Sequence, residues 1–223
     1  GRIYQMEAIR SVCEHVSQGY RKNLLAMATG TGKTRVSASI VDVFTRANQA
    51  TNILFLADRI ALVSQARDAY KSYLPDMSLC NFLEEKGEAR NSRIIFSTYP
   101  TMLNAIDSEK LDNGLPLFSP AHFDLIIVDE AHRSIFKKYK AIFDYFDAIL
   151  VGLTATPKDD VDKNTYDFFE CRDHIPTAAY DYKTATEIDK VLVPFHNIEV
   201  KTDFVFNGIH YDELSEEDRE RYE

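Results

Sequence analysis

The sequence predicts an α/β protein with a doubly wound parallel sheet and helices on both faces. Short continuous runs rich in Ile, Leu and Val recur along the chain, which is typical of strands buried on both faces. Stretches with helical spacing lie between these runs, and this alternation favours a parallel sheet. Polar motifs directly follow several runs, and such sheets bind ligands beyond the carboxyl ends of their strands.

The expected elements cover most of the chain. A helix-like stretch, 4–16, opens the sequence and suggests a fragment of a longer protein. A strand-like segment at 177–182 is followed by a short segment of no assigned type at 184–192 and by an alternating segment at 195–206. The expected strands are 23–28, 52–57, 93–98, 123–128 and 148–154, and the expected helices are 33–47, 59–73, 99–107 and 135–146.

Two domains are expected. The composition becomes polar and irregular after about residue 158, and we place a boundary near 183. Residues 1–183 then form the main domain, whereas 184–223 form a connector or the start of a second domain.

Composition and charge exclude several classes of protein. The 223 residues are 45% hydrophobic and 27% charged, as is ordinary for a soluble globular protein. The net charge is −9, of which the last twelve residues contribute −5, so bulk electrostatics cannot hold nucleic acid and any contact must be local. Three widely spaced cysteines give neither a zinc site nor a disulfide framework, and no run is long enough to cross a bilayer. We expect a reducing cytoplasm.

A glycine-rich loop joins the first expected strand to the next helix, in "MATGTGKT" (27–34). Gly30 and Gly32 allow a bulky anion to approach the backbone, and a helix start presents N–H groups and partial positive charge. Lys33 would reach the outer phosphates and the Thr34 hydroxyl would ligate Mg²⁺. An ordinary strand–helix turn is the alternative, but the full strand, loop and helix context favours a nucleoside triphosphate site.

An acid pair ends another buried strand, in "LIIVDEAH" (125–132). Asp129 could hold Mg²⁺ while Glu130 activates or orients the attacking water. A solvated turn is the alternative, and the preceding apolar residues argue against it. His132 is ambiguous by itself, because a lone histidine is more often structural.

Together the loop and the acid pair resemble superfamily 2 helicases and translocases, whose domains are RecA-like. That family commonly lacks the first loop glycine, so Met27 agrees with it. "DEAH" matches the second family motif, and "LTATP" (153–157) matches the third. In the third motif, Thr154, Ala155 and Thr156 are expected to couple hydrolysis to nucleic-acid contact.

The resemblance also implies a set of ligand-binding residues. "RIYQMEAI" resembles the segment that reads adenine, with Gln5 as the base contact and Arg2 beside it. The implied catalytic residues are Lys33, Asp129, Glu130 and His132, and the implied Mg²⁺ ligands are Thr34 and Asp129. The implied ATP-binding residues are Arg2, Gln5, Thr29, Gly30, Thr31, Gly32, Lys33, Thr34 and Arg35.

Two further segments match the family's nucleic-acid motifs, "LADRIALVSQ" and "STYPTM". Hydroxyls and helix starts would contact backbone phosphates without reading sequence. Alternatively, Ser97 or Thr98 caps a helix, and Asp58 and Arg59 form a local ion pair. The expected nucleic-acid contacts are Asp58, Arg59, Ser97, Thr98, Tyr99 and Thr101.

The wording of "ATGTGKT", "ADRIALVSQ", "VDEAHRS", "GLTATP" and "EIDKVLVPF" is similar to the motor (R) subunit of type I restriction enzymes. This resemblance implies an ATP-driven motor on duplex DNA, a second RecA-like domain that completes the ATP site, and methylase and specificity subunits as partners. Other superfamily 2 DNA or RNA helicases, a type III restriction motor and a nucleotide-dependent binding switch remain alternatives.

Overall fold

The computed structural model describes residues 2–108, 110–111, 114–131, 133–156, 161 and 163–194, with only the backbone described at 133–137. The chain divides into two compact units, Gly1–Leu192 and Val193–Glu223. Within the described residues, no helix is both long and apolar enough to span a membrane.

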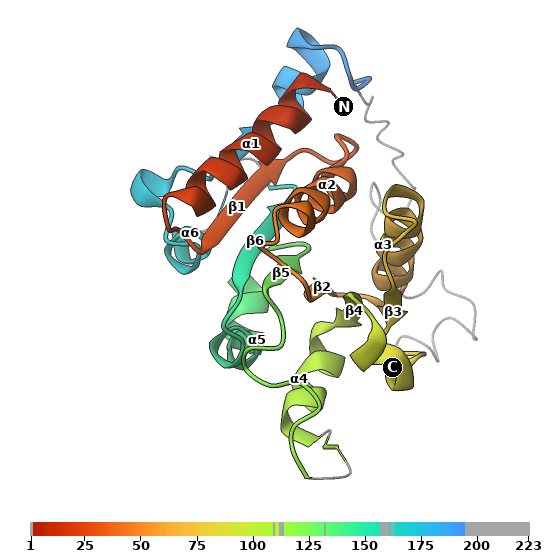
Figure 1. The fold of residues 1–223 in the computed structure, drawn as a ribbon. Helices are drawn as coiled ribbons and strands as arrows, with labels where there is room; N and C mark the ends of the chain where they lie inside the picture. Colours follow the sequence, from red (N-terminus) through yellow and green to blue (C-terminus); the bar gives the residue numbers. More distant parts are fainter. Residues whose placement is uncertain are drawn as a thin grey trace, which may run out of the picture. The chain divides into compact units, whose positions relative to one another are not determined.

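Seven strands form one sheet in the order β3-β4-β2-β5-β6-β1-β7, and each neighbouring pair is parallel (Figure 1). This arrangement confirms the predicted α/β class. The strands are β1 (Lys22–Met27), β2 (Ile53–Ala57), β3 (Leu79–Asn81), β4 (Ile94–Thr98), β5 (Leu125–Val128), β6 (Ile149–Thr154) and β7 (Ala178–Tyr180).

The helices cover both faces of this sheet, as predicted for a doubly wound fold. Residues of α1, α2 and α3 form one buried cluster with alternate strand residues, and those of α4, α5 and α6 form another on the opposite face. The helices are α1 (Ile3–Ser17), α2 (Lys33–Arg46), α3 (Ile60–Tyr73), α4 (Tyr99–Ser108), α5 (Arg133–Tyr145) and α6 (Lys163–Phe168), with short 3₁₀ or π turns at Lys86–Asn91, Arg172–His174 and Thr184–Ile188.

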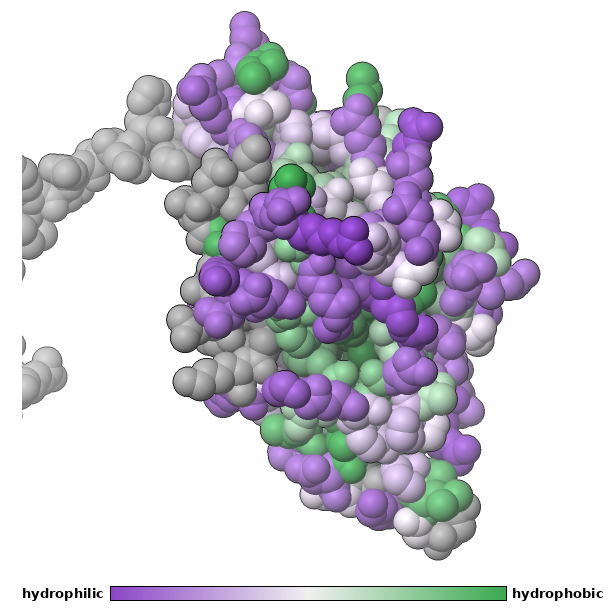
Figure 2. Space-filling view, turned by 90° about the vertical axis from the view of Figure 1, so that its left-hand side faces the viewer, coloured by the Kyte–Doolittle hydropathy of each residue, from purple (hydrophilic) through white to green (hydrophobic). Residues whose placement is uncertain are grey.

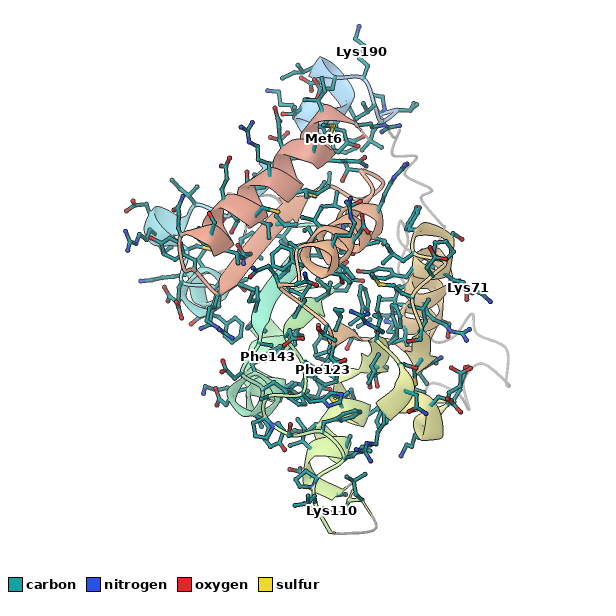
Figure 3. All side chains as sticks on the ribbon, in the orientation of Figure 1. Met6, Lys71, Lys110, Phe123, Phe143 and Lys190 are labelled. Atoms are coloured by element: carbon teal, nitrogen blue, oxygen red, sulfur yellow. The ribbon has the colours of Figure 1, made fainter. Side chains whose placement is uncertain are left out.

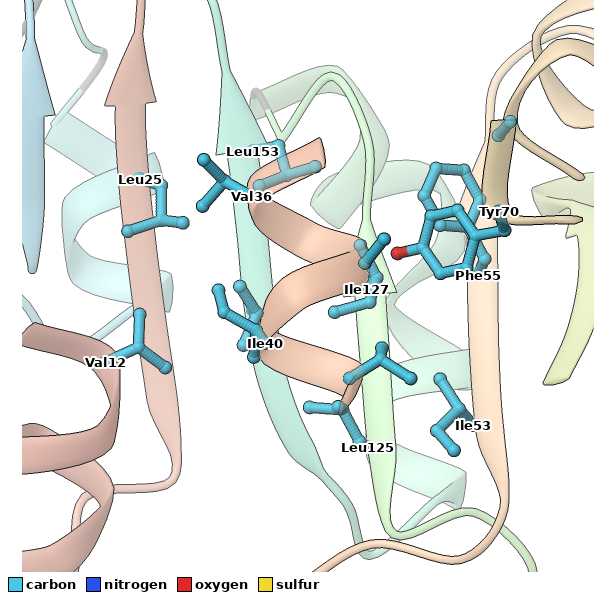
Figure 4. Close-up of a cluster of buried hydrophobic side chains, with 14 of the residues drawn as sticks. Val12, Leu25, Val36, Ile40, Ile53, Phe55, Tyr70, Leu125, Ile127 and Leu153 are labelled. Carbon is cyan, nitrogen blue, oxygen red and sulfur yellow. The ribbon is translucent and has the colours of Figure 1, made fainter. Parts of the chain in front are cut away.

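The two clusters bury the apolar runs from both sides. In the first, side chains from α1, α2 and α3 meet those of β1, β2, β5 and β6, including Val12, Leu25, Ile40, Ile127 and Tyr70 (Figure 4). In the second, Phe123 and Phe143 lie among the side chains on the α5 side of the sheet (Figure 3). Hydrophilic side chains cover most of the face shown in Figure 2.

The predicted elements agree with the observed ones to within a few residues. The sequence patterns predict no helix or strand at 79–91, where the structure has the short β3 and a 3₁₀ turn. Only three residues form β3, so its apolar run was too short to recognise. The alternating segment at 195–206 lies outside the described residues.

The first unit continues past the boundary expected near 183. Ala185 is fully buried, and Val191 and Leu192 pack against the α1–α3 cluster. The backbone N–H groups of Val191 and Leu192 both donate to the Ala185 carbonyl, at 2.8 and 3.0 Å. Residues 184–192 therefore belong to this unit, and a second domain beyond them stays a prediction.

Candidate functional site

Strand order brings the glycine-rich loop and the acid pair to one edge of the sheet. In the sheet, β6 lies directly between β1, which leads into the loop, and β5, which leads into the acids. The register pairs Ala26 with Thr154 and Val128 with Gly152, so these parallel strands run to the same edge of the sheet, and β5 ends two positions earlier along β6 than Ala26 does. Because neighbouring strands are about 5 Å apart, the two strands that carry these motifs are about 10 Å apart across the sheet.

Charges from the two motifs interact. Burial lowers the pKa of Lys33, and the Glu130 and Asp129 carboxylates offset part of that shift. Burial likewise raises the pKa of Asp129, as does Glu130, whereas Lys33 lowers it. The Lys33 Nζ atom donates to the Met27 carbonyl at 3.4 Å. Lys33 and the acid pair thus share one electrostatic environment.

The loop has the shape of an anion site. Gly30 and Gly32 have φ of +83° and +91°, in the left-handed region that favours glycine. Gly32 is the N-cap of α2 and carries no side chain, so no side-chain hydrogen bond caps the helix. The first-turn N–H groups of α2, which have no partner within the helix, remain available to phosphate oxygens.

Residues at the start of α1 hold this loop in place through hydrogen bonds. The Thr31 carbonyl accepts hydrogen bonds from the Tyr4 hydroxyl and from Gln5 Nε2, both at 2.9 Å. The Gln5 Oε1 atom accepts from the Arg2 backbone N–H at 3.2 Å, and the Thr31 hydroxyl donates to the Ala28 carbonyl at 2.6 Å. In this conformation Gln5 therefore holds the loop.

A hollow of about 430 Å³ opens beside the loop and collects most of the expected ATP-binding residues. The sequence had not singled out Tyr73, whose ring lies 5.8 Å from the exposed Arg35 guanidinium. Tyr73 is near the end of α3, about forty residues after the loop, and no sequence signal connects the two. The hollow is lined by Arg2, Gln5, Gly30, Thr31, Gly32, Arg35 and Tyr73.

The turn that carries the acid pair is fixed by hydrogen bonds to its neighbours. The Asp129 N–H donates to the Leu56 carbonyl at 2.9 Å, and the Ala131 N–H donates to the Leu153 carbonyl at 2.8 Å. Between them, Glu130 has φ of +52°, which is uncommon for a residue other than glycine. His132, the fourth expected catalytic residue, lies outside the described residues.

The third motif lies between the loop and the acids. Thr154 ends β6 and is buried, and its hydroxyl accepts from the Thr156 N–H at 3.1 Å. Ala155 and Thr156 are half-buried. This local bond shapes the turn, as Thr hydroxyls do, and places the motif beside both halves of the site.

The expected nucleic-acid contacts divide into two groups. Ser97 and Tyr99 are fully buried, so in this conformation their side chains do not reach the surface. Thr98 is also buried, and its hydroxyl accepts from the Thr101 N–H at 3.4 Å and pairs with the Thr101 hydroxyl at 2.9 Å. The helix-cap alternative therefore describes Thr98.

The remaining members of that set reach the surface. The Arg59 side chain is 81% exposed, and Thr101 is half-buried. Asp58 lies 4.0 Å from the Arg59 guanidinium, at the limit of an ion pair. Such an exposed pair contributes little to stability, so Arg59 is available to a ligand.

Fold and site together define the class of protein, a RecA-like core of the superfamily 2 helicase type. A solved SWI2/SNF2 ATPase core from Sulfolobus solfataricus, in complex with double-stranded DNA, has the same fold, with a TM-score of 0.60 and 19% identity over 75% of this chain and 35% of that one. A fragment described as an HsdR subunit of a type I restriction enzyme from Vibrio vulnificus matches with a TM-score of 0.58 and 28% identity, over 80% of this chain and 30% of that one.

Within that class the chain belongs to the family described as type III restriction enzyme, res subunit, which matches residues 1–159. It is also 32% identical over 212 residues to the type I restriction enzyme EcoAI endonuclease subunit of Escherichia coli, covering 93% of this chain and 25% of that protein. The type I restriction enzyme EcoKI endonuclease subunit of E. coli K12 is 30% identical over 217 residues, which cover 86% of this chain and 17% of that protein. These matches confirm the resemblance to the R subunits of type I restriction enzymes, and the chain spans a quarter or less of the length of these two relatives.

Proposed function

We propose that this chain is the first motor domain of an ATP-dependent DNA translocase, of the type found in restriction endonuclease R subunits. It binds and hydrolyses ATP with Mg²⁺ to move duplex DNA, in the cytoplasm. One observation carries the proposal: Lys33, Asp129 and Glu130 lie at one edge of the sheet, where both acids act on the pKa of Lys33 and Lys33 acts on the pKa of Asp129.

The chain's own residues supply the phosphate site. The loop glycines leave room for phosphate oxygens, and the N–H groups in the first turn of α2 donate hydrogen bonds to these oxygens. Lys33 neutralises their charge. Gln5, Arg2 and Arg35 line the adjoining hollow, where the nucleoside would lie. A half-buried lysine with a lowered pKa is stabilised by an incoming polyphosphate, so the residues fit this ligand.

The site also fits Mg²⁺. Thr34 and Asp129 would hold the ion, because a half-buried carboxylate with a raised pKa favours a cation beside it. Bound Mg²⁺ supplies positive charge against the phosphates. Glu130 orients the attacking water and takes up its proton, so catalysis is positioning and electrostatics without a covalent intermediate.

Movement along DNA requires more than this domain. A second RecA-like domain would close on the nucleotide and supply an arginine, and Thr154 and Thr156 would couple that closure to DNA at Arg59 and Thr101. Methylase and specificity subunits would choose the DNA site. Because the proposed ATP site is shared, residues 1–223 alone are expected to bind ATP weakly and hydrolyse it slowly, and brisk DNA-stimulated turnover by them would contradict a shared site.

The test is ATP hydrolysis by the intact protein with and without duplex DNA, together with displacement of a triplex-forming oligonucleotide as the readout of translocation. We expect Lys33→Ala to abolish nucleotide binding and Glu130→Gln to abolish hydrolysis while retaining binding. Lys71, on the outer surface of α3 (Figure 3), provides the control Lys71→Ala. Nucleotide binding without DNA-stimulated hydrolysis would favour a binding switch instead, and strand separation without triplex displacement would favour a helicase.

A further inference from the structure

We propose that Tyr99 positions the acid pair, by fixing the peptide group that joins Asp129 to Glu130. The inference rests on the proposed ATP hydrolysis. Tyr99, which was expected to contact nucleic acid, is thereby assigned a role at the site of ATP hydrolysis.

Tyr99 is built into the core beside the acids. It begins α4 directly after β4, and its side chain is fully buried. Its hydroxyl donates to the Asp129 carbonyl at 2.8 Å. Because β2 separates β4 from β5 in the sheet, this bond passes over the end of a whole strand to reach the acid turn.

A second aromatic ring orients Tyr99. The Tyr139 ring from α5 stacks on it, with centroids 5.3 Å apart and planes 16° apart. Tyr139 is itself buried, and it is the point at which α5 departs from helical geometry, with φ of −115° and ψ of 24°. Packing from both helices thus aims the hydroxyl of Tyr99 at one carbonyl.

That carbonyl controls the direction of Glu130. The Asp129 N–H is already fixed by the Leu56 carbonyl, so the Tyr99 bond fixes the other end of the same residue. The next residue, Glu130, has the uncommon φ of +52°, a conformation that persists only when its surroundings impose it. Without the Tyr99 hydroxyl the peptide can rotate, and the Glu130 carboxylate then moves away from the position that orients water.

A matched pair of variants separates positioning from simple structural support. Tyr99→Phe removes one hydroxyl-to-carbonyl bond and keeps the ring. Tyr145→Phe does the same elsewhere, since the Tyr145 hydroxyl donates to the Phe118 carbonyl at 2.8 Å, also on the α4–α6 face of the sheet. Both variants lose a bond of one kind and length, but only Tyr99 contacts the acid turn.

The experiment measures ATP hydrolysis by the intact protein at saturating duplex DNA, together with binding of a non-hydrolysable ATP analogue and the melting temperature. We expect Tyr99→Phe to lower kcat about tenfold, the effect of losing 1.4 kcal/mol of transition-state stabilisation, with KM and analogue affinity within about twofold of wild type. Tyr145→Phe should keep the wild-type kcat while its melting temperature falls to a similar extent.

A further variant covers the case in which Tyr99→Phe does not fold. Tyr139→Leu keeps the Tyr99 hydroxyl but removes the Tyr139 ring that stacks on Tyr99. We expect a smaller loss of kcat, about threefold, with unchanged affinity for the ATP analogue. Unaltered kcat in the folded variants, or equal losses in Tyr99→Phe and Tyr145→Phe, would overturn the positioning role. A wild-type protein without ATP hydrolysis would instead overturn the proposed function and this inference with it.

Discussion

Gln5 packs against Gly32 so closely that a Cβ on residue 32 would lie 2.6 Å from Gln5 Nε2. The same glycine has φ of +91°, so any side chain there is both strained and in collision with the amide that holds the Thr31 carbonyl. The segment before β1 and the phosphate loop therefore fit together only with glycine at this position.

Gly32→Ala should consequently disturb the loop in two ways, by straining the backbone and by displacing Gln5. We expect the free energy of unfolding to fall by about 1–2 kcal/mol and the affinity for an ATP analogue to fall at least tenfold, because Gln5 must leave the loop. Chemical denaturation and analogue titration measure the two effects. Gly87→Ala is the control, since Gly87 has open space around its Cβ position and no positive φ; an equal effect there would contradict the explanation.

Lys33→Met should separate stability from binding. Burial lowers the pKa of Lys33, so its charge destabilises the unliganded fold at pH below the lowered pKa, and the cost disappears above the usual 10.5. We expect the variant to melt at the wild-type temperature or higher near neutral pH, and to lose all stabilisation by ATP and Mg²⁺. Lys71→Met should keep that stabilisation, and a large loss of unliganded stability in Lys33→Met would disagree with the sign.

Asp129→Asn should affect stability with the opposite pH dependence to Lys33→Met, because the cost of the Asp129 charge is lost at low pH rather than at high pH. Burial and Glu130 raise the pKa of Asp129 above 3.8, so the folded protein binds more protons than the unfolded chain between 3.8 and the raised value. The cost of the charged carboxylate is full above the raised pKa and absent below 3.8. We therefore expect the variant to be more stable than wild type near neutral pH, with the difference vanishing toward pH 4 in a series of denaturation curves without Mg²⁺.

Sequence patterns predicted the sheet and the meeting of Lys33 with the acid pair, because short apolar runs and strand-end motifs are local signals. They could not place Tyr99, which was expected to contact nucleic acid and is buried, with its hydroxyl on the Asp129 carbonyl. Nor could they foresee that Tyr4 would stack on Tyr180, with ring centroids 3.8 Å apart. Such contacts join segments distant along the chain, and a single sequence contains no signal for them.

Arg59→Ala should weaken DNA binding without affecting the fold. The Arg59 side chain is exposed at the start of α3 and only loosely paired with Asp58. Loss of one phosphate contact should lower affinity for duplex DNA uniformly across sequences and reduce the magnitude of the salt slope by about 1. Titrations of the intact protein at several salt concentrations measure this. Arg46→Ala removes another exposed arginine, paired with Asp42 on α2, and an identical effect there would indicate general charge rather than a contact at Arg59.

Gly152→Ala tests whether close packing behind the acid pair sets its position. A Cβ on this β6 residue would lie 2.3 Å from the Phe169 ring and 2.9 Å from the Ala131 Cβ, directly after the acids. Overpacking of this kind costs about 1–3 kcal/mol of folding free energy, and displacement of residue 131 should lower kcat as well.

Adding Phe169→Leu to Gly152→Ala makes room for the new Cβ on the side of the ring. We expect this double variant to be more stable than the sum of the two single changes predicts, so that their effects are not additive. If stability recovers but kcat does not, the Ala131 contact is what positions the acids; additive losses would show that Gly152 and Phe169 act independently.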